Sequence, residues 1–279
     1  MKKSYIFGTG STARRVYNLI KQDHEVIGFL DNDQSKWGSM IDGIPVIAFT
    51  ERLLETEYDE ILVCSLPAME TIKQQLIDAG VPCNFINTEY VSTQTQARIN
   101  FLRDYANIWQ KENACVAEGG VYQGDFAKEI NECFPDSPLY LFDTFEGFDQ
   151  RDLSKEHAEN YSEMQAKHIG NTSVELVIGK LPHQGNAIIR KGYFPETARG
   201  LEDKRFCFVN LDFDLYNPTI EGLRFFYPRM LENGVILVHD YYNEGYKGVK
   251  QAVEEYAGEV GTAIKLFPIG DHCSIGIMK

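Results

Sequence analysis

The stretch that decides the fold is RFCFVNLDFDLYNPTIEGLRFFYPRMLENGVILVHDYY, residues 205–242. It holds two apolar, strand-like runs at 206–211 and 235–238, with a helical pattern from Pro218 to about Met230 between them. This order predicts two parallel strands joined by a helix. Neighbouring strands of an open parallel sheet end at the same edge, where ligands bind. The residues that follow the two runs are therefore expected to meet.

Polar side chains follow both runs. Asp212 and Asp214 come directly after the first, and His239 and Asp240 come directly after the second. Carboxylates and imidazoles are ligands for divalent cations. We therefore expect Asp212, His239 and Asp240 to form a metal site inside an active-site cleft.

Alternation of strand and helix patterns occurs twice along the 279 residues, which predicts an α/β protein of two Rossmann-like domains. Residues 1–92 predict a small domain, with a proline-containing edge segment at 43–47. Residues 93–279 predict the second domain, entered through a polar junction at 90–98 and a helix over 96–111. Its strands are expected at 114–118, 139–142, 186–190, 206–211, 235–238, 262–267 and 273–278. The last two read as a hairpin, so we expect a seven-stranded doubly wound sheet with one antiparallel strand.

Composition excludes several classes of function. A net charge of −14 argues against nucleic acid as a partner, because phosphate binding needs a basic face. The sequence contains no run of about 18 apolar residues, so it predicts no membrane span. The N-terminus shows no secretory apolar region, which predicts a cytoplasmic location. The six cysteines lack metal-type spacing and are expected to be reduced.

A glycine-rich loop opens the second domain. The strand that ends at Glu118 runs into Gly119 and Gly120, and Gly124 precedes a helix at 126–133. We expect Gly120 and Gly124 to let the backbone approach a ligand, and the helix N-terminus to offer free N–H groups to its carboxylate. Asp143 ends the next strand, about 20 residues on, where an acidic side chain accepts hydrogen bonds from a ribose diol.

The loop has three residues between its glycines, which favours S-adenosylmethionine over a dinucleotide, and Glu118 is placed to reach the polar end of that ligand. The full set expected to bind the cofactor is Glu118, Gly119, Gly120, Tyr122, Gly124, Asp143 and Thr144.

Four segments in order resemble the macrocin O-methyltransferase (TylF/MycF-type) family, namely residues 114–149, 192–197, 211–216 and 239–241. The resemblance covers about residues 96–279. It implies a class I, S-adenosylmethionine- and Mg²⁺-dependent methyltransferase that acts on a sugar or glycoside hydroxyl.

The family's metal ligands map onto Asp212 and, in place of an Asp-Asp pair, onto His239 and Asp240. Mg²⁺ prefers oxygen ligands, whereas Mn²⁺, Fe²⁺ and Zn²⁺ accept nitrogen readily, so the identity of the metal stays open, with Mg²⁺ or Mn²⁺ expected first. Asp212, with Asp214 or His272 as the proton acceptor, completes the expected catalytic set.

The first 92 residues resemble a different group. Residues 8–13, 28–31 and 43–46 are similar to the nucleotide-sugar-binding half-domain of PglD-type sugar acyltransferases and to the start of NAD-dependent epimerases. This predicts a nucleotide or nucleotide-sugar at Gly8, Gly10 and Asp31. The alternative is a degenerate Rossmann unit used for docking or for homo-oligomer formation.

The sequence therefore predicts a metal-assisted O-methyltransferase whose acceptor is a small sugar or glycoside. One alternative is an NAD-dependent nucleotide-sugar oxidoreductase or epimerase centred on the first domain. The other is a non-catalytic sugar-nucleotide carrier module fused to the methyltransferase.

Overall fold

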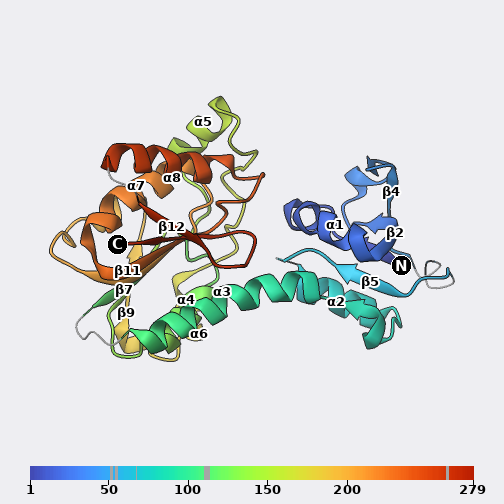
Figure 1. Cartoon of the computed structure of the whole chain (residues 1–279), viewed down its shortest axis with the longest axis horizontal. Coiled ribbons are helices and arrows are strands. Elements are labelled where there is room, and N and C mark those ends of the chain that lie inside the picture. Colours follow the sequence, from blue (N-terminus) through green and yellow to red (C-terminus); the bar gives the residue numbers. More distant parts are fainter. Residues whose placement is uncertain (51–52, 54–55, 67, 110–113, 262–263) are drawn as a thin grey trace. The chain divides into compact units, whose positions relative to one another are not determined.

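The computed structural model describes residues 1–50, 53, 56–66, 68–109, 114–261 and 264–279 (Figure 1). The chain forms two compact units, residues 1–96 and 97–279. Helix α3 (Glu89–Ile108) contains the point of division, so the predicted junction at 90–98 is helical. Val91 and Leu102 are both fully buried and lie eleven residues apart, close to three helical turns. Val91 is thus buried in the part of the helix that belongs to the first unit, and Leu102 in the part that belongs to the second.

The first unit contains a six-stranded sheet in the order β3-β4-β2-β1-β5-β6. Its elements are β1 (Lys2–Phe7), α1 (Ser11–Asp23), β2 (His24–Leu30), β3 (Met40–Ile41), β4 (Ile44–Ile47), β5 (Glu60–Val63), α2 (Met69–Asp78) and β6 (Ile86–Asn87). Only β3 runs antiparallel to its neighbour. The segment 43–47 was expected at an edge, but β4 pairs on both sides. Pro45 is tolerated because the ladder to β2 uses Val46 and Ile47.

The second unit contains a seven-stranded sheet in the order β12-β13-β11-β10-β7-β8-β9. Its strands are β7 (Cys115–Gly119), β8 (Leu139–Asp143), β9 (Ala187–Lys191), β10 (Phe206–Leu211), β11 (Met230–Val238), β12 (Lys265–Pro268) and β13 (Ile275–Met278). β13 is antiparallel to both of its neighbours and the other pairs are parallel. The predicted doubly wound sheet with one antiparallel strand is confirmed. Residues 262 and 263 of the predicted strand 262–267 lie outside the described residues.

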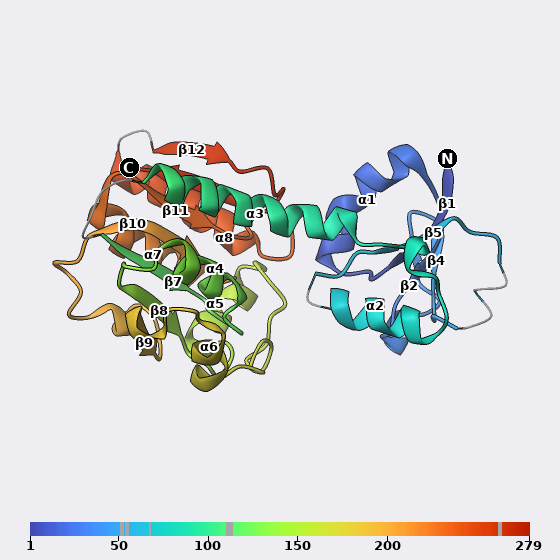
Figure 2. The ribbon, with the colours of Figure 1, turned by 90° about the horizontal axis from the view of Figure 1, so that it is seen from below.

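Helices cover both faces of this sheet (Figures 1 and 2). Apolar residues of α7 (Tyr216–Phe226) and α8 (Lys247–Val260) form one core with the strands. Those of α3, α4 (Asp125–Cys133) and α6 (Val174–Lys180) form the other. Helix α5 (Gln150–Ala158) packs on α7. Burial on both faces is why β10 is apolar along most of its length rather than alternating.

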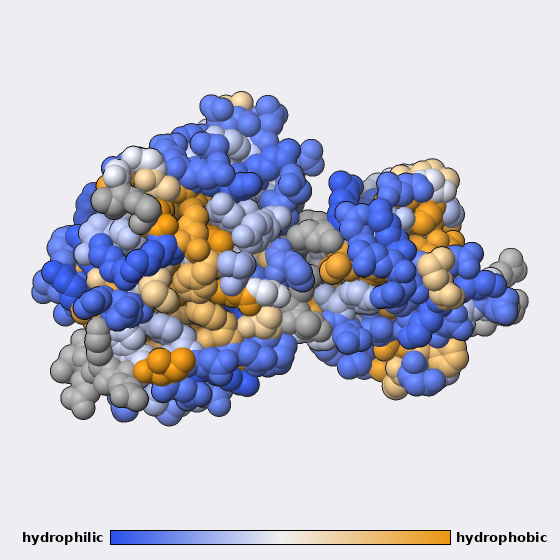
Figure 3. Space-filling view, viewed as in Figure 1, coloured by the Kyte–Doolittle hydropathy of each residue, from blue (hydrophilic) through white to orange (hydrophobic). Residues whose placement is uncertain are grey.

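Hydrophilic residues cover much of the visible face of each unit (Figure 3). None of the helices in the described ranges is long and apolar enough to cross a membrane.

Candidate active site

The glycine loop after β7 is fastened to the end of β8. The Asp143 carboxylate accepts hydrogen bonds from the backbone N–H groups of Val121 (2.8 Å), Tyr122 (2.9 Å) and Phe145 (2.6 Å). Asp143 therefore lies beside the loop, as its spacing predicts. Part of its acceptor capacity holds the loop in shape.

The glycines at 119 and 120 are required by another part of the chain. Gly120 has φ +79°, and a Cβ built there would lie 1.9 Å from the Asp212 carbonyl oxygen. A Cβ on Gly119 would lie 2.2 Å from the Phe213 ring. The Asp212 N–H also donates to the Gly119 carbonyl at 2.7 Å. The sequence analysis expected a ligand to approach Gly120 closely. In the structure, the chain segment after β10 makes that close approach and leaves no room for a side chain at Gly119 or Gly120.

The remaining loop residues contact neighbouring segments. Gly124, with φ +81°, is the N-cap residue that precedes α4 and faces Val177. The Tyr122 hydroxyl donates to the Asn171 side chain at 2.7 Å. Thr144 donates through its hydroxyl to the Gly147 carbonyl at 2.5 Å, which closes the turn after β8.

A buried charge group lies under the loop. Glu118 is 2% exposed, and its Oε1 accepts a hydrogen bond from Asn210 at 2.9 Å. Burial raises the pKa of Glu118, although the nearby Arg98 guanidinium opposes the shift. Oε2 of Glu118 has no hydrogen-bond partner among the described residues. An orphaned buried acceptor directly before the loop suits a ligand that carries a donor, such as an amino group.

Arg98 was missed by the sequence reasoning. Its guanidinium pairs with the Asp212 carboxylate at 3.1 Å and lies over the Phe126 ring, 3.8 Å from the centroid. It reaches this position from α3, and its spacing to Asp212 carries no signal in a single sequence.

A cleft of about 540 Å³, counting its part open to solvent, connects the loop with the segments that follow β8, β9 and β10. Its lining residues include Gly120, Asp143, Thr144, Phe148, Asp149, Asp152, Tyr193, Phe194, Asp212, Phe213, Leu215 and Pro218. Three predicted cofactor residues and one predicted metal ligand thus share one cleft.

Asp152 and Tyr193 are cleft residues that the sequence did not single out for a role. The Tyr193 hydroxyl donates to the Asp152 carboxylate at 2.9 Å. Burial raises the pKa of Asp152 to about 6, against the hydrogen bonds from Tyr193 and Asn217 that lower it. Tyr193 stood within the quoted 192–197 motif, whereas Asp152 had no sequence signal.

The carboxyl edge of β10 and β11 carries an acidic group. One oxygen each from Asp212, Asp214 and Asp240 lies within 4.8 Å of the others. Burial and then the Asp240 and Asp212 carboxylates raise the pKa of Asp214, which shares a hydrogen bond with Asp240. Three crowded carboxylates form an all-oxygen set of the kind that hard divalent cations bind, and a cation would relieve their repulsion. These residues fit a metal.

His239 belongs to a second group, with Asp240 and Cys273. The three predicted metal ligands are therefore divided between two groups that share Asp240. Burial lowers the pKa of His239. The Asp212 carboxylate and the Cys273 side chain outweigh this effect and raise the pKa to about 10 overall. His272 is exposed and belongs to neither group.

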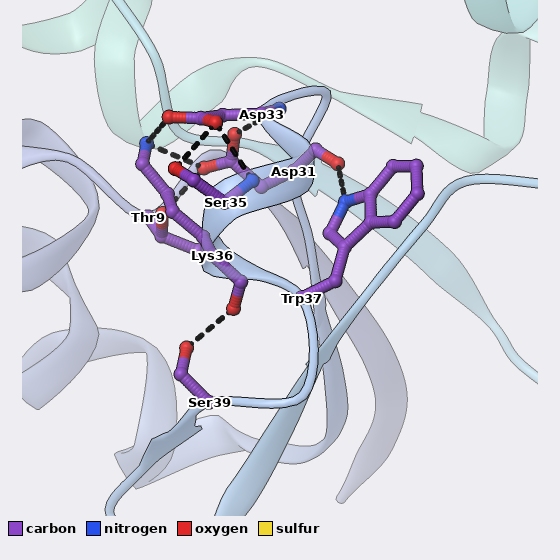
Figure 4. A network of polar contacts seen from close by, with 7 residues as sticks. All are labelled: Thr9, Asp31, Asp33, Ser35, Lys36, Trp37 and Ser39. Atoms are coloured by element: carbon purple, nitrogen blue, oxygen red, sulfur yellow. Dashed lines mark hydrogen bonds and ion pairs between the residues drawn. The ribbon is translucent and has the colours of Figure 1, made fainter.

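The corresponding edge of the first unit has its own polar network (Figure 4). Thr9 donates through its hydroxyl to the Asp31 carboxylate, and Lys36 approaches the same oxygen at 3.0 Å. The other oxygen accepts from the Asp33 N–H at 2.9 Å. Burial raises the pKa of Asp31, but these hydrogen bonds outweigh it and the pKa is lowered. Asp31, where a nucleotide or nucleotide-sugar is predicted, thus accepts hydrogen bonds from its own unit.

The strand order of the second unit, with one antiparallel strand next to the last, is that of class I methyltransferases. Residues 97–275 match the model of the macrocin-O-methyltransferase (TylF) family, and the chain belongs to this family. Residues 1–86 match the model described as C2185-like, N-terminal.

One curated relative is the 8-demethyl-8-(2,3-dimethoxy-alpha-L-rhamnosyl)-tetracenomycin-C 4'-O-methyltransferase of Streptomyces olivaceus. It is 24% identical over 157 residues, 52% of this chain. The match spans 59% of that relative's length.

Two solved structures share the fold. The O-methyltransferase NovP has a TM-score of 0.52 and 20% identity, over 66% of this chain and 79% of that one. The calicheamicin methyltransferase CalS11 has a TM-score of 0.52 and 15% identity, over 76% and 91%.

Proposed function

We propose that residues 97–279 form an S-adenosylmethionine-dependent O-methyltransferase that acts on a hydroxyl of a sugar or glycoside, assisted by a divalent cation. Family membership and a relative named for a rhamnosyl acceptor support this activity. The observation that carries it is the single cleft that holds Gly120, Asp143 and Thr144 at one part of its wall and Asp212 at another.

S-adenosylmethionine, when bound, would supply an electrophilic methyl group. The orphaned Glu118 Oε2 suits its amino group, and Asp143 has acceptor capacity for a ribose hydroxyl. Gly119 and Gly120 draw the segment after β10 against the loop, which places Asp212 in the same cleft as these residues.

Asp212 and Asp240, with Asp214 beside them, would hold the cation, which would supply positive charge to lower the pKa of a hydroxyl. Asp214 is placed among these carboxylates and is the proposed proton acceptor. His272, the other candidate, is exposed and stands apart from the group. Arg98 holds the Asp212 side chain through its ion pair.

Transfer of a labelled methyl group tests the proposal. The full chain is incubated with S-adenosylmethionine and a panel of glycosides and sugar nucleotides, with Mg²⁺, with Mn²⁺ and with a chelator. We expect methylation of at least one acceptor and its loss under chelation. Absence of heat on titration with S-adenosylhomocysteine would reject the cofactor.

For the first unit we propose a nucleotide or nucleotide-sugar ligand at the edge that carries Gly8 and Gly10. A dinucleotide, which needs the carboxylate after the second strand for a ribose, is the alternative ligand at this edge. Titration of the full chain with UDP-sugars and with NADH separates the two. Tight NADH binding would restore the oxidoreductase or epimerase alternative.

A further inference from the structure

The end of β11 and the turn before β13 bring three different ligand atoms together. Cys273 Sγ lies 4.0 Å from Nε2 of His239 and 3.3 Å from Oδ1 of Asp240. A tetrahedral zinc ion, with bonds of about 2.0–2.3 Å, separates its ligand atoms by about 3.5 Å. The two observed distances bracket that spacing.

Hydrogen bonding fixes the orientation of the imidazole. The Ser274 hydroxyl donates its single proton to the Asp271 carboxylate at 2.6 Å, because a carboxylate only accepts. Ser274 must then accept from Nδ1–H of His239, at 3.0 Å. Nε2 is left as the nitrogen that faces Cys273. Metal-binding histidines are held in this way through their other ring nitrogen.

The same carboxylate supports the cysteine. Asp271 is 2% exposed, and its Oδ1 accepts from the backbone N–H groups of Cys273 (2.9 Å) and Ser274 (2.7 Å). One buried aspartate therefore holds both the turn that presents the thiol and the hydroxyl that orients His239.

From this geometry we propose that His239, Asp240 and Cys273 bind a borderline-soft divalent cation of the zinc class. A nitrogen, a sulfur and an oxygen ligand select such ions over Mg²⁺. Three protein ligands leave the fourth position open to a small ligand. On binding, the thiol proton and any proton on Nε2 pass to solvent. Because Asp240 also belongs to the all-oxygen group, ions at the two positions are coupled through it.

Cobalt titration of the full chain tests the proposal, since Co²⁺ occupies zinc sites and absorbs light. The metal-free protein is titrated with Co²⁺ and then with Zn²⁺ or an excess of Mg²⁺. We expect one equivalent of Co²⁺ to give a near-ultraviolet thiolate-to-cobalt band and the visible bands of a four-coordinate ion. Zn²⁺ should remove them and Mg²⁺ should not. Cobalt binding without a thiolate band, or no binding, overturns the proposal.

Matched variants assign the band. Cys273→Ser should abolish it, and His239→Asp should weaken Co²⁺ binding by about tenfold or more. Cys133→Ser, at the end of α4 and outside both groups, should leave it unchanged. An undiminished band in Cys273→Ser also overturns the proposal. The wild-type spectrum needs no variant to fold, and it is independent of methyl transfer, so failure of either proposal is distinguishable.

Discussion

The two units of this chain present the same sequence pattern with different surroundings. Each has a glycine-containing loop after its first strand and an aspartate at the end of its second, Asp31 in one and Asp143 in the other. Asp31 is held by the side chains of Thr9 and Lys36 and by one backbone N–H. Asp143 is held mainly by three backbone N–H groups, two of them from the glycine loop, with the Thr144 hydroxyl 3.5 Å from one of its oxygens.

The difference lies in what else reaches the edge of the sheet. In the second unit, segments after β7, β8, β9 and β10 line one cleft, and acidic groups follow β10 and β11. A loop and an aspartate therefore indicate a Rossmann-like unit. An active site is indicated only where the ends of several further strands meet at the same edge of the sheet.

The strongest test of this comparison is Asp212→Asn against Asp33→Asn. We expect the first change to lower methyl transfer by about 100-fold or more, because a cation ligand supplies several kcal/mol of stabilisation. Asp33 lies in the first unit's network and its change should leave transfer intact. Circular dichroism checks folding, since Arg98 loses its charged partner. Equal rates in the two variants would remove the metal role of Asp212.

Cofactor affinity gives the next contrast, between Asp143→Asn and Asp31→Asn. The asparagine at 143 keeps one acceptor oxygen for three backbone N–H groups and a ribose, so S-adenosylhomocysteine should bind about tenfold or more weakly. Asp31→Asn should bind it as the wild type does. Calorimetry measures both affinities. Unchanged binding by Asp143→Asn would place the cofactor elsewhere.

Backbone requirements separate Gly120 from Gly10. Alanine at 120 would be strained at φ +79° and would collide with the Asp212 carbonyl, so we expect a loss of at least about 3 kcal/mol in unfolding free energy. No atom lies within 4 Å of a Cβ at Gly10, and Gly10→Ala should keep its stability. Denaturant titration followed by far-ultraviolet circular dichroism compares them. A stable Gly120→Ala protein would contradict the close packing at the loop.

The smallest expected effect is on the pH dependence of stability, through two buried carboxyl groups whose pKa values are shifted in opposite directions. The pKa of Asp152 is raised to about 6, so its ionisation destabilises the fold above pH 4 and fully above pH 6. Asp152→Asn should therefore gain about 1–2 kcal/mol at pH 7.5 and nothing near pH 4.

Glu60 of the first unit behaves in the reverse sense. Burial raises its pKa, but hydrogen bonds from Asn87 and His24 lower it overall. Its stabilisation is present at neutral pH and is lost as the pH falls, so Glu60→Gln should destabilise at pH 7.5. Unfolding curves at the two pH values test both signs. A destabilised Asp152→Asn protein at pH 7.5 would mean that the carboxylate gains more from Tyr193 than it loses by burial.

Local patterns were enough to place the strands of the second unit, whereas helices α5, α6 and α8 were not predicted. Runs such as 206–211 are long, apolar and bounded by polar residues, so their strands could be read directly. The polar stretch 90–98 contains the point at which the chain divides into two units, and α3 runs through it. Its polar composition did not indicate a helix over its first residues.

The candidate site was only partly predictable. Asp212, Asp214 and Asp240 follow strands, and strand ends are predictable. Arg98 and Asp152 project from helices, Cys273 stands in a turn, and their approach to the site depends on how those segments pack. No spacing rule in one sequence encodes that packing.

Taken alone, the order of apolar runs and the residues that end them determined the doubly wound sheet and the edge where polar groups gather, because strand direction and side-chain burial are local and periodic. Only the tertiary structure decided which ligands stand together. It placed Cys273 beside His239 and Asp240, since distances of a few ångströms between remote segments depend on the packing of the whole unit.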